Sequence, residues 1–214
     1  MWSAPAQRRM SDCGGELEEA AELERQTLWM LLAINGAMFF AEAIAGWWGE
    51  SAGLLADSLD MLADATVYGI VLYAVGRSRA LQARAASASG VLEIALGIGV
   101  LLEVGRRFFY GSEPESLLMI GMGTLALAAN AACLLLIAKH RDAGVHMRAS
   151  WIFSTNDVIA NLGVIISGVL VLYLGTRLPD LIIGTLIAIV VVRAGVRILR
   201  EAKEARALEP DYRR

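Results

Sequence analysis

The stretch LLADSLDMLAD at residues 54–64 decides the fold, because it places three aspartates in a segment with apolar flanks. A charged side chain at the centre of a bilayer costs at least about 2.5–3.5 kcal/mol. At about 100° per residue, Asp57, Asp60 and Asp64 share one helix face that is roughly 60° wide. The stretch therefore predicts a helix with one acidic face in an otherwise apolar setting.

The rest of the chain has the composition of an integral membrane protein. Of its 214 residues, 57% are hydrophobic and 19% are charged, and the charged ones gather at the ends and in a few short gaps. A helix needs roughly 20 apolar residues to cross a bilayer. Charge-poor stretches of about that length lie at 27–48, 52–76, 88–105, 116–138, 149–175 and 179–199. The sequence predicts an all-α membrane protein with six transmembrane helices.

The distribution of Lys and Arg predicts the orientation, because both favour the cytoplasmic side of short loops. They precede the first span, lie in alternate loops and end the chain, while the other side keeps only Arg106, Arg107 and Arg177. We expect both termini in the cytoplasm and a multi-pass location in the inner (cytoplasmic) membrane. The expected parts are a cytoplasmic leader at 1–26, a six-helix membrane domain at 27–199 and a short cytoplasmic tail at 200–214.

Ionisable side chains within the spans are candidate functional groups. They are Glu42, Asp57, Asp60, Asp64, Glu93, Glu103, Asp157 and Arg193. All but Arg193 are acids, so protons or bound cations must neutralise them. Counting 1.5 Å per residue places Asp64, Asn130 and Asp157 roughly 18–20 Å below the outer boundary. Three spans thus bring oxygen ligands to one level, which suits a divalent cation.

Some of these polar residues have a structural alternative. Asp57 belongs either to the site or to a packing contact with a neighbouring span. Asn130 and Asn161 are more typical of hydrogen bonds between helices than of ligands. Glu93 and Glu103 are expected to be structural, with Glu103 pairing with Arg106 or Arg107.

Three residues outside this acidic set also carry groups able to bind metal. His146, in the loop between the fourth and fifth spans, is either solvated or a weak metal-capture point at the cytoplasmic mouth. Cys13 and Cys133 are predicted to be free thiols, since one lies in the leader and the other within a span. No clustered basic patch is present, so a nucleic acid partner is not expected.

Several segments together resemble the cation diffusion facilitator family of divalent metal transporters. SAGLLADSLDMLADA looks like the second span of that family, in which Ala-Asp is followed three residues later by His or Asp and four residues after that by Asp. RASWIFSTNDVIANLGVIISG is similar to its fifth span, and LPDLIIGTLIAIVVVRAGVRILREA resembles its sixth. The resemblance covers about residues 28–202.

The resemblance implies a tetrahedral metal site between the second and fifth spans of each protomer of a homodimer. By position, Asp60 and Asp64 match the second-span ligands and Asp157 matches the second ligand of the fifth span. The first ligand of that span falls on Phe153, which cannot bind a metal. The fourth place is left to Ser154, Asn130, Asp57 or water. The chain ends soon after the sixth span, so we expect it to lack the C-terminal cytoplasmic domain of most family members.

The function that follows is export of a divalent transition metal from the cytoplasm by proton antiport with alternating access. Zinc is the expected ion, with cadmium, cobalt, manganese or iron also possible; the ion is cargo, and no cofactor is expected. Membrane lipid is the other expected partner. The alternatives are a cation channel, a proton-coupled carrier of another solute and, remotely, an intramembrane aspartyl protease. The leading prediction is a secondary active transporter and not an enzyme, without catalytic residues.

Overall fold

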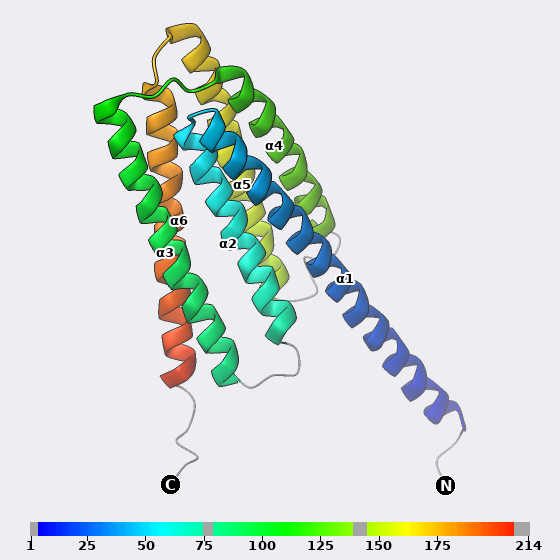
Figure 1. Ribbon diagram of the computed structural model, residues 1–214. Coiled ribbons are helices and arrows are strands. Elements are labelled where there is room, and N and C mark those ends of the chain that lie inside the picture. The colour runs from blue at the N-terminus through cyan, green and yellow to red at the C-terminus, as the bar shows by residue number, and fades with distance from the viewer. Residues whose placement is uncertain (1–3, 75–78, 139–144, 208–214) are drawn as a thin grey trace.

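The computed structural model describes the backbone of residues 4–74, 79–138 and 145–207 and the side chains of 25–70, 72–73, 81, 83–137 and 157–204. The described residues form helices and no strands. In chain order these are α1 (Ala4–Trp48), α2 (Ala52–Ala74), α3 (Arg79–Tyr110), α4 (Ser116–Ala138), α5 (Val145–Leu174) and α6 (Leu178–Ala207) (Figure 1). The predicted all-α fold with six helices is confirmed.

Five of the six helices are long and apolar enough to cross a membrane by length and composition. These segments are Arg25–Trp48, Ala83–Tyr110, Ser116–Ile137, Asp157–Leu174 and Leu178–Glu204. The exception is α2, which has 23 residues but carries three aspartates. Its three charged residues exclude α2 from this group of helices. Its place in the bundle shows how those aspartates are accommodated.

The helices form a bundle in which α2 contacts every other helix. The closest partners are α3 with α6, α1 with α2 and α4 with α5. Alternating helix directions bring the start of α1 and the end of α6 to the same end of the bundle (Figure 1). The acidic helix therefore lies at the centre, where its neighbours shield its aspartates from lipid.

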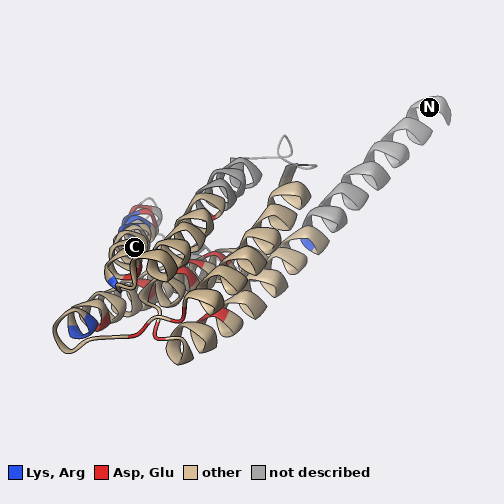
Figure 2. Ribbon diagram, turned by 90° about the horizontal axis from the view of Figure 1, so that it is seen from above, with Lys and Arg blue, Asp and Glu red and all other residues tan. Residues whose placement is uncertain are grey.

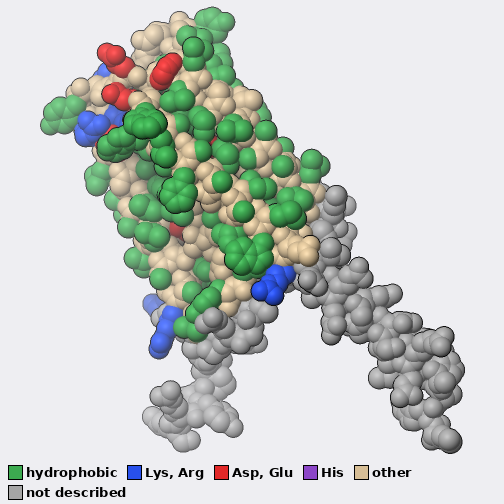
Figure 3. All heavy atoms as spheres, turned by 45° about the vertical axis from the view of Figure 1, so that its right-hand side comes forward, with side chains coloured by type: hydrophobic (Ala, Val, Ile, Leu, Met, Phe, Trp, Pro, Cys, Tyr) green, Lys and Arg blue, Asp and Glu red, His purple; other side chains and the backbone are tan. Residues whose placement is uncertain are grey.

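The flank of the bundle is apolar, as a membrane protein requires. Figure 3 shows hydrophobic side chains over the flank and Lys and Arg side chains toward the ends. Large aromatic side chains crowd the end where α1, α3 and α5 finish: Trp47, Trp48, Phe109, Tyr110 and Tyr173, all at least 69% exposed. Tryptophan and tyrosine favour the membrane–water interface. This end therefore marks one boundary of the membrane, although which side it faces stays a prediction.

The predicted division into leader, membrane domain and tail also stays a prediction. Residue 26 lies within α1 and residue 199 lies within α6, so both proposed boundaries fall inside continuous helices.

Glycines end two of the helices at the aromatic end. Gly111 after α3 and Gly175 after α5 have φ of 96° and 60°, a conformation that glycine adopts without steric penalty. Their amides donate hydrogen bonds to carbonyls in the last turn, Gly111 to Arg107 at 2.9 Å and Gly175 to Val171 at 3.0 Å. These caps stop the helices just past the aromatic boundary.

The start of α2 is held by a carboxylate from α6. Asp180, fully buried, accepts hydrogen bonds from the Ser51 hydroxyl (2.7 Å), the Ala52 amide (2.7 Å) and the Gly53 amide (2.9 Å). The Ser51 hydroxyl also accepts a bond from the Leu54 amide at 3.1 Å, as an N-cap residue does. Three of the otherwise unpaired N–H groups of this helix end are therefore satisfied.

A close backbone approach at the same place joins α2 to α6. A Cβ atom built on Gly184 would lie 2.7 Å from the carbonyl carbon of Ala52, too near for a side chain. Gly184 and Asp180 lie one helical turn apart, so the close approach and the carboxylate cap act together to fix the start of α2 against α6.

We expect Asp180→Ala to lower the stability of the protein by about 2–4 kcal/mol, because it leaves buried donors of α2 without an acceptor. In a protein of this size such a loss corresponds to a fall of roughly 5–15 °C in melting temperature. Thermal unfolding in detergent measures it. Asp180→Asn, which keeps one acceptor oxygen and the shape of the side chain, serves as the milder variant. Equal melting temperatures for the wild type and Asp180→Ala would contradict the capping role.

Candidate metal centre

The acidic face of α2 points into the bundle. Asp57 and Asp64 are buried, at 1% and 8% exposed, and Asp60 is half-buried. In Figure 2 several acidic positions lie among the helices and others lie at the edge, while Lys and Arg positions lie at the margins. The three aspartates that were predicted to share one helix face thus line the interior of the bundle.

Asp157 of α5 meets this face from the opposite side. Its carboxyl group lies close enough to those of Asp60 and Asp64 to interact with them electrostatically. It is 6% exposed, and its Oδ2 atom has no hydrogen-bond partner in the described part of the chain. The structure therefore brings together the three aspartates that the sequence nominated as metal ligands.

Two side chains donate hydrogen bonds to these aspartates, one to a carboxylate and one to a backbone carbonyl. The Tyr68 hydroxyl donates to Asp64 Oδ2 at 3.2 Å, and Asn161 Nδ2 donates to the backbone carbonyl of Asp157 at 2.7 Å. The sequence analysis missed Tyr68, although it follows Asp64 by four residues and so lies on the same helix face. A hydroxyl bonded to one oxygen leaves the other oxygen of Asp64 available for a cation.

The side of the site toward α4 contains polar groups with little hydrogen bonding. Asn130 is 1% exposed, and neither atom of its amide has a partner among the described residues. One turn further on, Cys133 lies within electrostatic range of Asp64 and Asp157 and contacts Asn35 Nδ2 through its sulfur at 3.8 Å. Cys133 is a free thiol, as predicted.

The expectation that Asn130 and Asn161 form hydrogen bonds between helices is wrong for the described contacts. Asn161 bonds within its own helix instead, because its amide reaches the carbonyl of Asp157 one turn back. Asn130 keeps an unpartnered amide oxygen one turn from Cys133, and therefore stays a candidate for the fourth ligand.

A second acidic pair lies on the side toward α1. Glu42 is fully buried, and its carboxyl group neighbours that of Asp57. None of their four oxygens has a hydrogen-bond partner within the described residues. The sequence holds a signal for this pair: Glu42 and Asp57 are almost equally far from the short turn that joins α1 to α2, so an antiparallel hairpin sets them at one depth. Asp57 thus has both a packing partner and a place beside the cluster.

The carboxylates are close but do not form a finished coordination shell. Among the residues with described side chains, no three Asp, Glu, His or Cys groups converge at the distances of a metal site. Like charges repel when no cation lies between them, so binding must draw these side chains inward. Phe153, Ser154, His146 and Cys13 have side chains outside the described part, and the roles predicted for them stay predictions.

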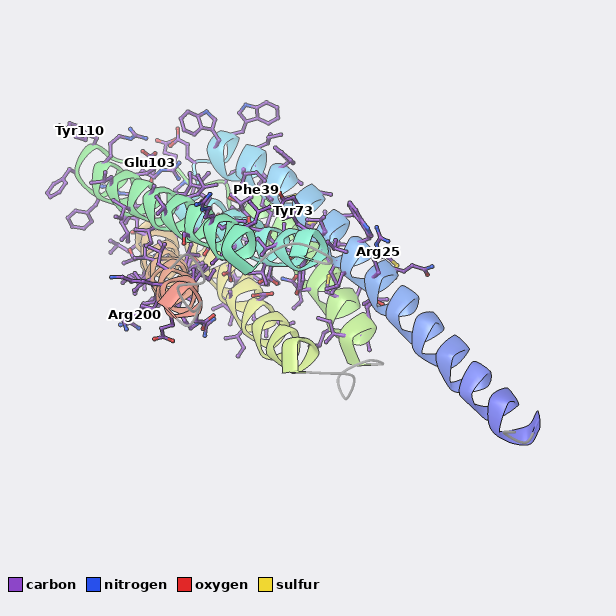
Figure 4. The ribbon with its side chains drawn as sticks, turned by 90° about the horizontal axis from the view of Figure 1, so that it is seen from below. Arg25, Phe39, Tyr73, Glu103, Tyr110 and Arg200 are labelled. Atoms are coloured by element: carbon purple, nitrogen blue, oxygen red, sulfur yellow. The ribbon has the colours of Figure 1, made fainter. Side chains whose placement is uncertain are left out.

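The predicted structural role of Glu103 is confirmed. Its carboxylate pairs with Arg106 at 2.7 Å and with Arg107 at 2.8 Å, one turn along α3. Figure 4 shows Glu103 near the Tyr110 end of α3 and Arg25 pointing away from the bundle. An acid that is neutralised in this way by neighbouring arginines has no charge left for a metal ion.

Comparison with known proteins shows the family to which this chain belongs. Residues 28–205 match the cation efflux transmembrane domain. The chain belongs to the cation efflux family. This confirms the resemblance noted for residues 28–202, and the chain is a multi-pass membrane protein.

Relatives within the cation efflux family are distant in sequence. The zinc transporter ZitB of Yersinia pestis is 27% identical over 188 residues, covering 82% of this chain and 60% of that protein. A cadmium, cobalt and zinc/H(+)-K(+) antiporter of Bacillus velezensis is 23% identical over 185 residues, covering 80% of this chain and 59% of that protein. This cation efflux chain therefore spans about 60% of the length of these relatives.

Proposed function

We propose that this chain moves divalent transition-metal cations out of the cytoplasm in exchange for protons. The observation that carries the proposal is the meeting of Asp60 and Asp64 of α2 with Asp157 of α5 inside the bundle. Two buried acids and one half-buried acid, none of them in an ion pair with a Lys or Arg of the described residues, require protons or a cation for neutrality. The same carboxylates cannot hold both at once, and that competition links the two ions.

The cycle follows from this competition together with alternating access. In an inward-open state the deprotonated aspartates bind the metal from the cytoplasm. In an outward-open state protons displace it, and the protonated site returns. Tyr68 and Asn161 act on the aspartates and not on the ion, since one holds Asp64 and the other bonds the backbone of Asp157.

The names of the relatives support zinc as the principal ion, with cadmium and cobalt as further cargo. The ligand chemistry supports a wider range, because an all-oxygen set also suits Mn²⁺ and Fe²⁺. The family match favours transport over an intramembrane aspartyl protease, so the proposed role is that of a secondary active transporter and not of an enzyme. We further propose a homodimer in the inner membrane, with cytoplasmic termini.

The experiment that tests the proposal is reconstitution into liposomes with a metal-sensitive dye inside. A panel of Zn²⁺, Cd²⁺, Co²⁺, Mn²⁺ and Fe²⁺ is offered with and without a pH gradient. Entry of at least one of these metals, faster than in protein-free liposomes, is expected. Equal rates in both preparations for every metal would overturn the proposal.

We expect Phe153→His to shift selectivity toward Zn²⁺ over Mn²⁺, because an imidazole at this position would complete the ligand set that the family uses and favours the softer ion. The ratio of Zn²⁺ to Mn²⁺ transport should rise by about tenfold, a ligand contribution of roughly 1.4 kcal/mol. Phe153→Leu is the control, since it alters the packing without adding a ligand. The same ratio in Phe153→His and Phe153→Leu would mean that residue 153 does not face the cluster.

A further inference from the structure

Glu93 of α3 is a buried acid that the three-aspartate site leaves unexplained. It is 2% exposed, and neither of its carboxylate oxygens has a hydrogen-bond partner among the described residues. An ionisable group at this depth costs at least about 2.5–3.5 kcal/mol unless something compensates for it. The sequence analysis treated Glu93 as structural, but a structural acid should have the donors that Glu103 has on the same helix.

Helix packing fixes the depth of Glu93. Gly90 and Gly195 let α3 and α6 approach closely, and a Cβ atom built on Gly195 would lie 3.2 Å from the Cβ atom of Glu93. Gly184, in contact with Ala52 at the start of α2, lies eleven residues before Gly195, or about 16 Å along α6. Both helices start at the same end of the bundle, so the same distance counted along α2 from Ala52 ends near Ala63. Glu93 therefore lies at the level of Asp60 and Asp64.

The electrostatic surroundings of Glu93 join it to the metal centre. Asp60 and Asp64 of α2 both lie within electrostatic range of its carboxylate. The guanidinium of Arg197 on α6 also interacts electrostatically with the Glu93 carboxylate. Glu93 thus approaches the aspartates of α2 from α3.

We propose that Glu93 is a further ligand of the transported cation and binds it together with Asp60. The inference rests on the proposed function of the same site. Phe153 of α5 cannot bind a metal, and a fourth carboxylate on α3 would supply the missing ligand. Its oxygen donors favour hard and borderline divalent ions, Mn²⁺ in particular. The long glutamate side chain allows Glu93 to swing toward Asp60 as a cation draws the acids inward.

Metal binding to the purified, full-length protein in detergent tests this assignment. Glu93→Gln keeps the shape of the side chain, and we expect it to weaken Mn²⁺ binding by at least about tenfold in calorimetry, as loss of a ligand should. X-ray absorption of the bound Mn²⁺ should report a changed set of oxygen ligands. The matched control is Glu103→Gln, an acid of the same helix outside the site, which should bind Mn²⁺ as the wild type does.

The variant Arg197→Gln distinguishes two roles of Glu93: a metal ligand, or only an ion-pair partner of Arg197. If Glu93 serves only to pair with Arg197, both variants weaken Mn²⁺ binding alike and leave the absorption spectrum of the bound ion unchanged, which overturns the inference. If Glu93 is a ligand, Arg197→Gln leaves Mn²⁺ affinity equal or tighter, because a competing positive charge has gone.

The outcome for Glu93 is distinguishable from that of the proposed function. Wild-type binding by Glu93→Gln, alongside loss of binding in Asp64→Asn, would remove Glu93 from the site and leave the transporter proposal standing. Failure of the wild type to transport any metal of the panel would instead overturn the proposed function itself.

Discussion

Asp64→Ala is expected to reduce metal transport more than about 100-fold, and Asp60→Ala and Asp157→Ala are expected to do the same. Loss of a residue that merely supports a metal ligand costs about 10–100-fold in affinity, so loss of a ligand should exceed it. All three aspartates meet inside the bundle, where water cannot replace a missing carboxylate easily. Dye-reported uptake into liposomes, normalised to the amount of folded protein, is the measurement.

The control for these variants is Glu103→Ala, which removes an acid that lies beside two arginines and away from the cluster. Its transport should stay close to that of the wild type. Removing a buried acid relieves its desolvation, so the aspartate variants should melt at the same or a higher temperature than the wild type without metal. Normal transport by any one of the three would exclude that residue from the site.

A proton gradient directed out of inverted vesicles held acidic inside is expected to drive metal uptake into them against the metal's own gradient. Protons that enter the site from the acidic side displace the metal there, so the energy of the proton gradient is transferred to the metal gradient. Acidifying the metal-loading side below about pH 6 should slow transport, because protonated carboxylates do not bind metal and burial favours the protonated form. Stability of the metal complex is thus present at higher pH and lost as pH falls.

An ionophore that collapses the proton gradient separates an antiporter from a channel. For an antiporter, accumulated metal should leak back until the concentrations are equal once the ionophore is added. A channel lined by the same acids would also be inhibited by acid, but it could only equilibrate the metal. Uptake that stops at equal concentrations and ignores the ionophore would replace the antiporter proposal by a channel.

The sequence predicted the parts of the site that depend on one helix at a time. The shared face of Asp57, Asp60 and Asp64 follows from helix periodicity alone, and the pairing of Glu103 with its arginines follows from spacings of three and four residues. Even the meeting of Asp64 with Asp157 could be expected, because counting residues from the membrane boundary gives the depth of each.

The contacts that the sequence did not predict depend on which helices become neighbours. Residue counting gives the depth of Glu93 only. Its approach to the acids of α2 also requires the close packing of α3 on α6 that Gly90 and Gly195 permit. Glu42 was recognised as an intramembrane acid, but its contact with Asp57 needs the α1–α2 hairpin as well as its depth. Asn161 was misjudged because a short amide side chain can bond its own helix as readily as another.

The carboxylate cap of Asp180 fixes α2 at one end and leaves the rest of the helix less constrained. Hydrogen bonds from Ser51, Ala52 and Gly53 to Asp180 and the backbone contact at Gly184 hold the start of α2, so any tilting of α2 is expected to pivot there. Asp64 lies twelve residues from this fixed end, at a distance of about 18 Å, and the far end of α2 lies about 33 Å away. A tilt of about 10° then moves Asp64 by roughly 3 Å and the far end by roughly 6 Å. A small rotation is enough to separate two carboxylates from a shared ion, and it opens the helix end opposite the cap about twice as far.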